Sequence, residues 1–131
     1  MKHTIILIVM FFALGLCNIS YGQSTTTHMK VVQFKKGTQG ASYQDAVIRG
    51  ERMVYVLGAR KGQTMIVKVW AKEKNVVFQI RHRKTKKYLP DTEPGKGART
   101  WTGALPYSGN YEVIVGGTRG NASYNISFTI M

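Results

Sequence analysis

The sequence predicts an all-β protein: a single antiparallel β-sandwich of about eight strands, jelly-roll-like, over residues 30–131. Three observations lead to this fold class. Apolar and polar residues alternate with a period of two in many short stretches, as in strands that bury one face. Gly, Pro, Asn and Ser separate these stretches at short intervals. After residue 22 no stretch has the 3.6-residue period of a helix, so two packed sheets are the expected architecture.

The last thirty residues carry the clearest strand pattern. In 111–115 and 124–130, apolar side chains stand at every second position, and they are aromatic or branched. Turn-forming residues precede the first run at 106–110 and separate the two runs at 116–121. We therefore expect a hairpin that forms the middle of a sheet, with its two turns exposed to solvent.

The earlier part of the sandwich domain shows the same alternation in shorter runs. Strands are expected at 30–36, 41–48, 53–57, 64–71, 75–83 and 98–101, with a short edge piece at 87–90. The inward positions of these runs and of the last two define the expected core, which comprises Phe34, Tyr55, Leu57, Val67, Val69, Phe78, Ile80, Val113, Val115, Tyr124, Ile126 and Phe128.

The N-terminus has the pattern of a signal peptide rather than of a folded element. Lys2 supplies a charge, 5–16 is an apolar segment too short to span a bilayer, and small residues at 20 and 22 suit a cleavage site. We expect residues 1–22 to be removed on export to the periplasm or the medium, and 23–29 to be a flexible lead-in. Acylation at Cys17 is the alternative, although Leu16 replaces the small residue that usually precedes a lipoprotein cysteine. Without 1–22 the chain has no cysteine and no transmembrane segment.

The charge balance is strongly basic. The chain has 19 Lys and Arg against 6 Asp and Glu, and loss of Lys2 with the signal leaves 18 − 6, or +12. Such a surface attracts anions and accelerates encounter with them. Acidic polysaccharide, lipopolysaccharide phosphate, nucleic acid and acidic proteins are the partner classes that this charge suits, and plain solubility is the alternative explanation.

Catalytic chemistry finds little support in the sequence. His82 is the one histidine inside the expected domain, and the carboxylates are scattered along the chain. A zinc site needs more His or Cys than remain. The glycines at 116–120 precede a strand, whereas a phosphate-binding loop precedes a helix. We expect neither an enzyme nor a metal or cofactor.

The basic run at 81–87 is a candidate site for binding anions. If the strand at 64–71 is a sheet neighbour, its lysine and tryptophan lie on the same outward face as the arginines of this run. Cations beside an indole can bind sugars or single-stranded nucleic acid through charge and stacking. The residues of this hypothetical patch are Lys68, Trp70, Arg81, Arg83, Lys84, Lys86 and Lys87. The function that they suggest is an exported module for acidic glycans or cell-envelope phosphates. A solvated strand end is the other interpretation, and the run lacks the aromatics of a dedicated nucleic-acid surface.

The two turns of the last thirty residues support a different function. Ser108, Gly109, Asn110 and Tyr111 form the first, and the second, at 118–122, carries Arg119 and Asn121. Rigidly held loops with a hydroxyl and a guanidinium suit insertion into another protein's cleft, because arginine pairs with carboxylates in a planar fork. On chemistry alone, ordinary turns explain these residues better than a binding role does, because Gly-Asn and Ser-Gly are common in turns.

A family resemblance connects these pieces. Val-Gln-Phe-Lys-Lys-Gly at 32–37, Lys-Gly-Gln-Thr-Met at 61–65, Trp-Thr-Gly-Ala-Leu-Pro at 101–106 and Ser-Gly-Asn-Tyr at 108–111 occur in an order that resembles the bacterial periplasmic inhibitors of goose-type (g-type) lysozyme. The order is also similar to the wider group of pre-peptidase C-terminal β-sandwich domains. The resemblance covers nearly all of the mature chain.

The resemblance implies that loops of a sandwich block the substrate cleft of a lysozyme. Ser108 and Tyr111 match the family's Ser-Gly-x-Tyr motif, and Arg119 matches an arginine of the second loop. Because a +12 protein repels a basic enzyme, the target is expected to be acidic or near neutral, or the charge to be asymmetric.

Overall fold

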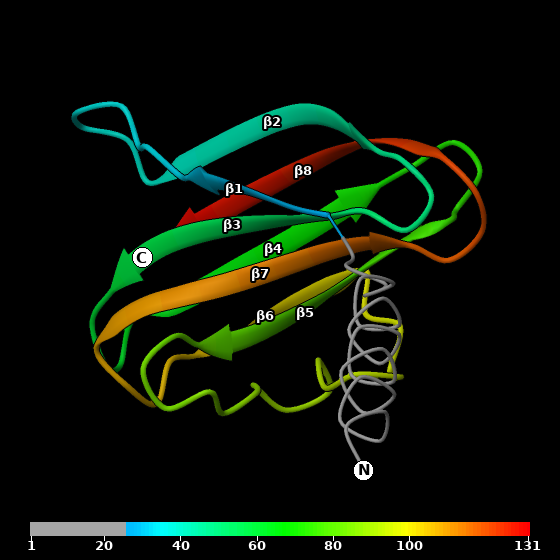
Figure 1. The fold of residues 1–131 in the computed structure, drawn as a ribbon. Helices are drawn as coiled ribbons and strands as arrows, with labels where there is room; N and C mark the ends of the chain where they lie inside the picture. The colour runs from blue at the N-terminus through cyan, green and yellow to red at the C-terminus, as the bar shows by residue number, and fades with distance from the viewer. Residues whose placement is uncertain (1–25) are drawn as a thin grey trace, which may run out of the picture.

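A computed structural model describes residues 26–131, which form eight strands and no helix. Within this part of the chain there is therefore no helix that could cross a membrane. Figure 1 shows the strands, whose bounds are β1 Thr27–Val31, β2 Gly40–Val47, β3 Arg52–Ala59, β4 Thr64–Trp70, β5 Val76–His82, β6 Thr100–Ala104, β7 Gly109–Gly117 and β8 Ala122–Ile130. They build two packed four-stranded sheets, so the predicted sandwich is confirmed.

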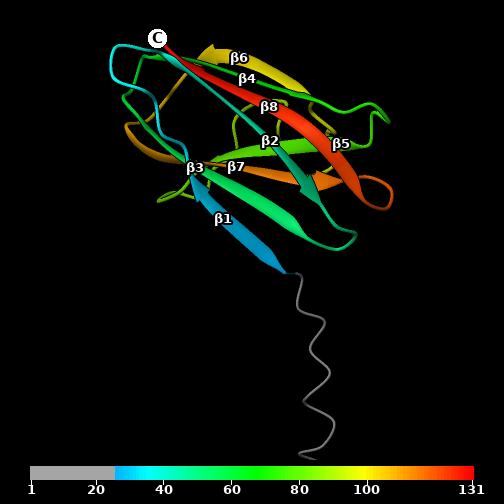
Figure 2. The same cartoon turned by 90° about the horizontal axis from the view of Figure 1, so that it is seen from above.

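The chain changes sheet at every connection. One sheet has the order β1-β3-β7-β5 and the other the order β2-β8-β4-β6, so odd and even strands are fully segregated. The two layers are seen separately in Figure 2. The predicted hairpin at the C-terminus is therefore wrong: β7 and β8 are each central, but in different sheets. Alternation identifies a strand and its buried face, whereas it does not identify the partner strand, and the 118–121 turn crosses between layers.

The first strand begins earlier than expected and pairs in parallel, although an antiparallel sandwich was predicted. β1 starts at Thr27, inside the predicted lead-in, and ends before Phe34. It pairs with β3 in parallel, in the register Met29 to Val54, whereas all other strand pairs are antiparallel. The predicted signal peptide at 1–22, with Cys17, lies outside the described residues.

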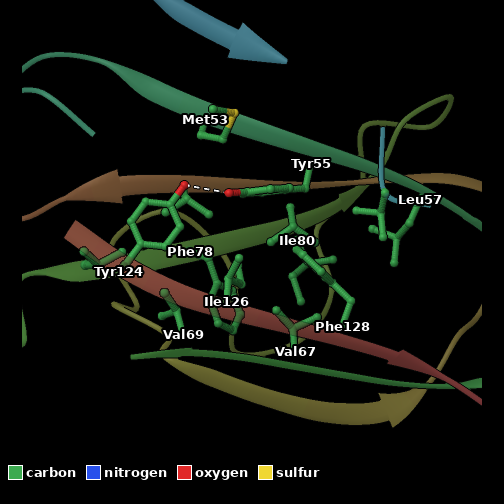
Figure 3. Packing of buried hydrophobic residues seen from close by; sticks show 14 of the residues in the cluster. Met53, Tyr55, Leu57, Val67, Val69, Phe78, Ile80, Tyr124, Ile126 and Phe128 are labelled. Carbon is green, nitrogen blue, oxygen red and sulfur yellow. Dashed lines mark hydrogen bonds between the residues drawn. The ribbon is translucent and has the colours of Figure 1, made fainter. Parts of the chain in front are cut away.

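The inward positions of both sheets form one core. Every residue of the predicted core is buried except Phe34, which is half-buried and packs against the others. In the centre of the core the hydroxyls of Tyr55 and Tyr124 are 2.8 Å apart and hydrogen-bond across the two sheets (Figure 3). This bond satisfies two polar groups that would otherwise be costly to bury.

The long segment between β5 and β6 folds back along β5. Tyr88 bridges Arg81, as the predicted edge piece requires, and Ala98 bridges Phe78. The buried hydroxyl of Thr92 donates to the carbonyl oxygens of Ile80 and Leu89, at 3.1 and 2.8 Å. The segment thereby covers the edge of β5, which would otherwise be open to pairing.

Candidate functional site

Three turns meet at the end of the sandwich where β7 begins, and we call this the Ser108 end. They are the β3–β4 turn at 60–63, the start of the β5–β6 connection at 83–87, and the β6–β7 turn at 105–108 with the first residues of β7. Because β3 and β5 both end where the antiparallel β7 starts, the topology brings these turns together. The Ser-Gly-Asn-Tyr motif lies at the centre of the group.

Tyr111 anchors the β6–β7 turn from inside the core. Its ring is fully buried, and its hydroxyl donates to the carbonyl oxygen of Tyr107 at 2.7 Å and accepts from the Tyr107 amide at 3.1 Å. Burial raises the pKa of this hydroxyl above its ordinary value, so it stays protonated. A tyrosine that bonds the backbone a few residues upstream resembles the tyrosine corner of other β-sandwiches. The turn is thus held in one conformation.

His82 holds the same turn from the neighbouring strand. Its Nε2 lies 2.9 Å from the carbonyl oxygen of Ser108, so Nε2 carries the proton and donates it. Its Nδ1 accepts from the Thr85 amide at 3.3 Å. The imidazole also packs on the rings of Tyr107 and Tyr111, with centroids 5.1 and 5.2 Å away. Sequence reasoning assigned no such role to His82, although its place two residues after the inward Ile80 indicates that it points into the core.

Ser108 is exposed and keeps a hydrogen-bond donor for a partner. Its Oγ accepts from the Lys61 amide at 2.8 Å, which leaves the hydroxyl proton available. Gly109 has a φ of 125°, and a Cβ there would lie 3.0 Å from His82 Nε2, so both backbone geometry and space require glycine. Beside this turn is an open hollow of about 270 Å³ lined by His82, Arg83, Lys84, Ser108, Gly109 and Asn110.

The Ser108 end is strongly cationic. The three turns expose the side chains of Arg60, Lys61, Arg83, Lys84, Lys86 and Lys87. Glu112 is buried, and its carboxylate is engaged by Arg81 Nε at 2.8 Å and Arg83 Nε at 3.8 Å. The remaining cations among these turns have no carboxylate partner within residues 26–131. This end therefore projects positive potential towards a partner.

Arg119 lies at the opposite end of the molecule. The strand β7 separates it from Ser108, and eight steps of about 3.3 Å span about 26 Å. Figure 1 shows the two turns at the left and right ends of β7. The two turns that the sequence suggested for insertion into one cleft therefore lie at opposite ends of the sandwich.

Local hydrogen bonds hold the Arg119 turn. A guanidinium nitrogen of Arg119 donates to the carbonyl oxygen of Glu73 at 3.0 Å, and Asn75 donates to the carbonyl oxygens of Arg119 and Asn121, both at 3.2 Å. The side-chain oxygen of Asn121 accepts from the Arg49 amide at 2.8 Å. These bonds connect the turn to both neighbouring turns, which is a structural role for Arg119 and Asn121.

The predicted basic patch divides into two parts. Arg81 projects from β5 and Arg83 directly follows that strand, whereas Lys68 and Trp70 project from β4, which belongs to the other sheet. The prediction that these residues share one face is wrong, because the turn between β4 and β5 crosses from one sheet to the other. Lys84, Lys86 and Lys87 join the Ser108 end, so the patch merges with the motif that was expected to be separate from it.

No protein-family model matches the chain, and no curated protein matches its sequence. Solved structures do match. The periplasmic inhibitor of g-type lysozyme from Aeromonas hydrophila, PliG, superposes with a TM-score of 0.71 at 26% identity, covering 82% of this chain and 100% of that one. PliG of Salmonella Typhimurium gives 0.63 at 23%, covering 79% and 98%. The pre-peptidase C-terminal domain of a Bacillus anthracis collagenase gives 0.59 at 12%, covering 82% and 99%. The chain is thus similar in structure to both groups that the sequence resembles.

Proposed function

We propose that this protein is an exported inhibitor of a g-type lysozyme, that it is not an enzyme, and that the Ser108 end makes the contact. The observation that carries the proposal is the likeness to the Aeromonas inhibitor, which extends over the whole of that chain. The rigid Ser-Gly-Asn-Tyr turn adds local support, because a preordered loop loses little entropy on binding.

The proposed mechanism is occlusion of the substrate cleft. A glycosidase cleft holds a carboxyl general acid within reach of the glycosidic oxygen. The Ser108 hydroxyl can donate a hydrogen bond to such a carboxyl group in its ionised form. Lys84 and Arg83, which line the same hollow as Ser108, can add charge-assisted contacts. With the turn in place, the sugar has no access to the acid.

The charge of the Ser108 end restricts the target. A cluster of exposed cations is attracted to an acidic cleft and repelled by a basic rim. We therefore propose a lysozyme whose cleft surroundings are acidic or neutral, even where its total charge is positive. Association should slow as salt is raised, because rim charges act mainly on the association rate.

Periplasmic location follows from the same proposal and from residues 1–22. The intact mass of the exported protein tests it: a chain that starts near Gln23 supports signal cleavage. A mass that includes acyl chains on Cys17 would instead identify a lipoprotein.

The functional test is inhibition of lysis of a peptidoglycan suspension by a g-type lysozyme. Ser108→Ala should weaken inhibition by about 0.5–1.5 kcal/mol, the net value of one hydrogen bond. Replacing Lys84, Lys86 and Lys87 by Gln should slow association and flatten its salt dependence. Arg119→Ala, at the far end of β7, is the matched control and should leave inhibition within about twofold of the unmodified protein.

Two outcomes would contradict the proposed contact. Loss of inhibition in the Arg119→Ala variant, with Ser108→Ala unaffected, would assign the contact to the opposite end. Absence of inhibition against goose-type enzymes, with chicken- and invertebrate-type enzymes as comparison, would reject the function itself.

A second candidate function uses the same cations. The unpaired lysines of the Ser108 end favour binding of acidic glycans or envelope phosphates. Retention on an anionic polysaccharide should then fall steeply with salt and disappear in the Lys84, Lys86 and Lys87 triple variant. Retention that persists in that variant would reject this site.

A further inference from the structure

The outer face of the sheet β2-β8-β4 is unlike the rest of the surface, and we call it the Trp70 face. Strand registers place its outward side chains in straight rows across three strands. One row is Ser42, Ser127 and Lys68, and the next is Gln44, Asn125 and Trp70.

The Trp70 face offers hydroxyls and amides in place of charges. Neighbouring outward positions add Ser123, Thr129 and, on β6, Thr100 and Thr102. Lys68 is its one cation, and none of its outward strand positions is acidic, although the protein as a whole is strongly charged. Within residues 26–131, the side chains of the two central rows make no hydrogen bond or ion pair with the protein. Their donors and acceptors are available to a ligand.

Trp70 is the most exposed aromatic feature of this surface. The residue is 65 % exposed, whereas Trp101 is half-buried and its indole nitrogen donates to the carbonyl oxygen of Pro90 at 2.9 Å. An open hollow of about 150 Å³ adjoins the Trp70 indole, lined by Ser42, Lys68, Trp70, Asn125, Ile126 and Ser127. The surface beside the indole is thus largely apolar, and the side chains of Ser42, Asn125 and Ser127 at its border carry hydrogen-bonding groups.

We propose that the Trp70 face binds a β-linked pyranose chain. Such sugars present a flat layer of C–H groups that stacks on an indole, while their equatorial hydroxyls bond to amides and hydroxyls at the sides. An extended, ribbon-like glycan also matches side chains that are arranged in rows across neighbouring strands. Trp70 is the last residue of β4, whereas the Ser108 end adjoins the first residue of β4, so this site is separate from the one proposed for inhibition.

Low charge makes the site distinguishable from the cationic end. Recognition by stacking and neutral hydrogen bonds changes little with ionic strength, whereas binding of a polyanion by lysines weakens steeply. Affinity for an uncharged sugar should therefore be nearly the same at low and high salt.

The experiment is calorimetric titration of the full mature protein with the tetramer of N-acetylglucosamine and with cellotetraose. We expect binding of at least one, with an affinity that varies by less than about twofold between 50 and 500 mM salt. Trp70→Ala should weaken it by roughly tenfold or more, as truncation of a binding tryptophan does. Asn125→Ala should weaken it less, and Lys84→Ala, on the cationic end, should leave it unchanged.

Because Trp70 and Asn125 are exposed, both variants should retain the unmodified melting temperature. Three results overturn the proposal: no binding of either sugar, equal affinity in Trp70→Ala, or loss of binding in Lys84→Ala. A single-stranded oligonucleotide that binds through Trp70 where the sugars do not would also overturn it, because the ligand would then be of another class.

Discussion

Tyr111→Phe removes only the hydroxyl group that holds the Ser108 turn by hydrogen bonds to its backbone. The ring stays in the core, so no cavity forms. What is lost is the hydroxyl that donates to the carbonyl oxygen of Tyr107 at 2.7 Å and accepts from its amide at 3.1 Å. Ser108 directly follows Tyr107, so the change loosens the residue proposed to enter the lysozyme cleft.

The magnitude follows from the two bonds. A buried hydrogen bond contributes about 0.5–1.5 kcal/mol net, so two give about 1–3 kcal/mol. Tyr107 is only half-buried and water can partly replace the hydroxyl, which favours the lower half, about 1–2 kcal/mol. For a domain of this size, that lowers the melting temperature by roughly 5–10 °C. Inhibition should weaken by about threefold to tenfold, because binding must then order the turn again.

Urea denaturation, the exchange rate of the Tyr107 amide and the lysis assay measure these effects together. Tyr107→Phe is the matched control, because the Tyr107 hydroxyl makes no hydrogen bond within residues 26–131 and its loss should change stability by less than about 0.5 kcal/mol. The reasoning is refuted if Tyr111→Phe matches that control and the Tyr107 amide remains protected.

Three further predictions concern the core and the outer face. Tyr124→Phe leaves the Tyr55 hydroxyl buried without a partner and should cost about 1–3 kcal/mol in urea denaturation, whereas the double variant with Tyr55→Phe should recover most of the loss; an additive double variant would contradict the bond. Burial raises the pKa of Tyr55, Tyr111 and Tyr124, so the folded state keeps protons that the unfolded chain releases near pH 10. Stability should hold below pH 10 and then fall with a slope that approaches about 4 kcal/mol per pH unit, measured by denaturation between pH 8 and 11; a flat profile would contradict it. Glu112→Gln weakens the bond to Arg81 and should lower the free energy of unfolding by about 1–2 kcal/mol, a value kept small because Arg81 is partly exposed. An unchanged urea midpoint would contradict a stabilising role for this ion pair.

Alternation along the chain predicted the strands and their buried faces well. The inward series at 76, 78 and 80 and the series at 124, 126 and 128 are both buried in the core. These predictions succeed because a period of two reflects one local choice, which side of a strand faces water. His82 continues the first series and could have been placed in the core on the same ground.

Strand pairing could not be predicted in the same way. Sequential strands usually pair, so a short turn between two alternating runs favours a hairpin. Here every connection crosses between sheets, and the four-residue turn at 118–121 does so as readily as the long 83–99 segment. The sequence pattern of a crossing turn is that of a hairpin turn, and only the packing of both inner faces distinguishes them.

The separation of Ser108 from Arg119 could, by contrast, have been predicted from the sequence. An extended strand lies between them, and any extended strand of nine residues holds its ends about 26 Å apart. The meeting of Ser108 with Lys84 and Lys61 could not be predicted, because it depends on which strands are neighbours.

Hydrogen exchange of the protein with and without a g-type lysozyme tests the central claim most directly. If the Ser108 end occupies the cleft, amides at 60–63, 83–87 and 105–110 should become protected in the complex, while those at 118–121 keep their free exchange rates. Protection at 118–121 with none around Ser108, or no protection anywhere at saturating enzyme, would contradict the account.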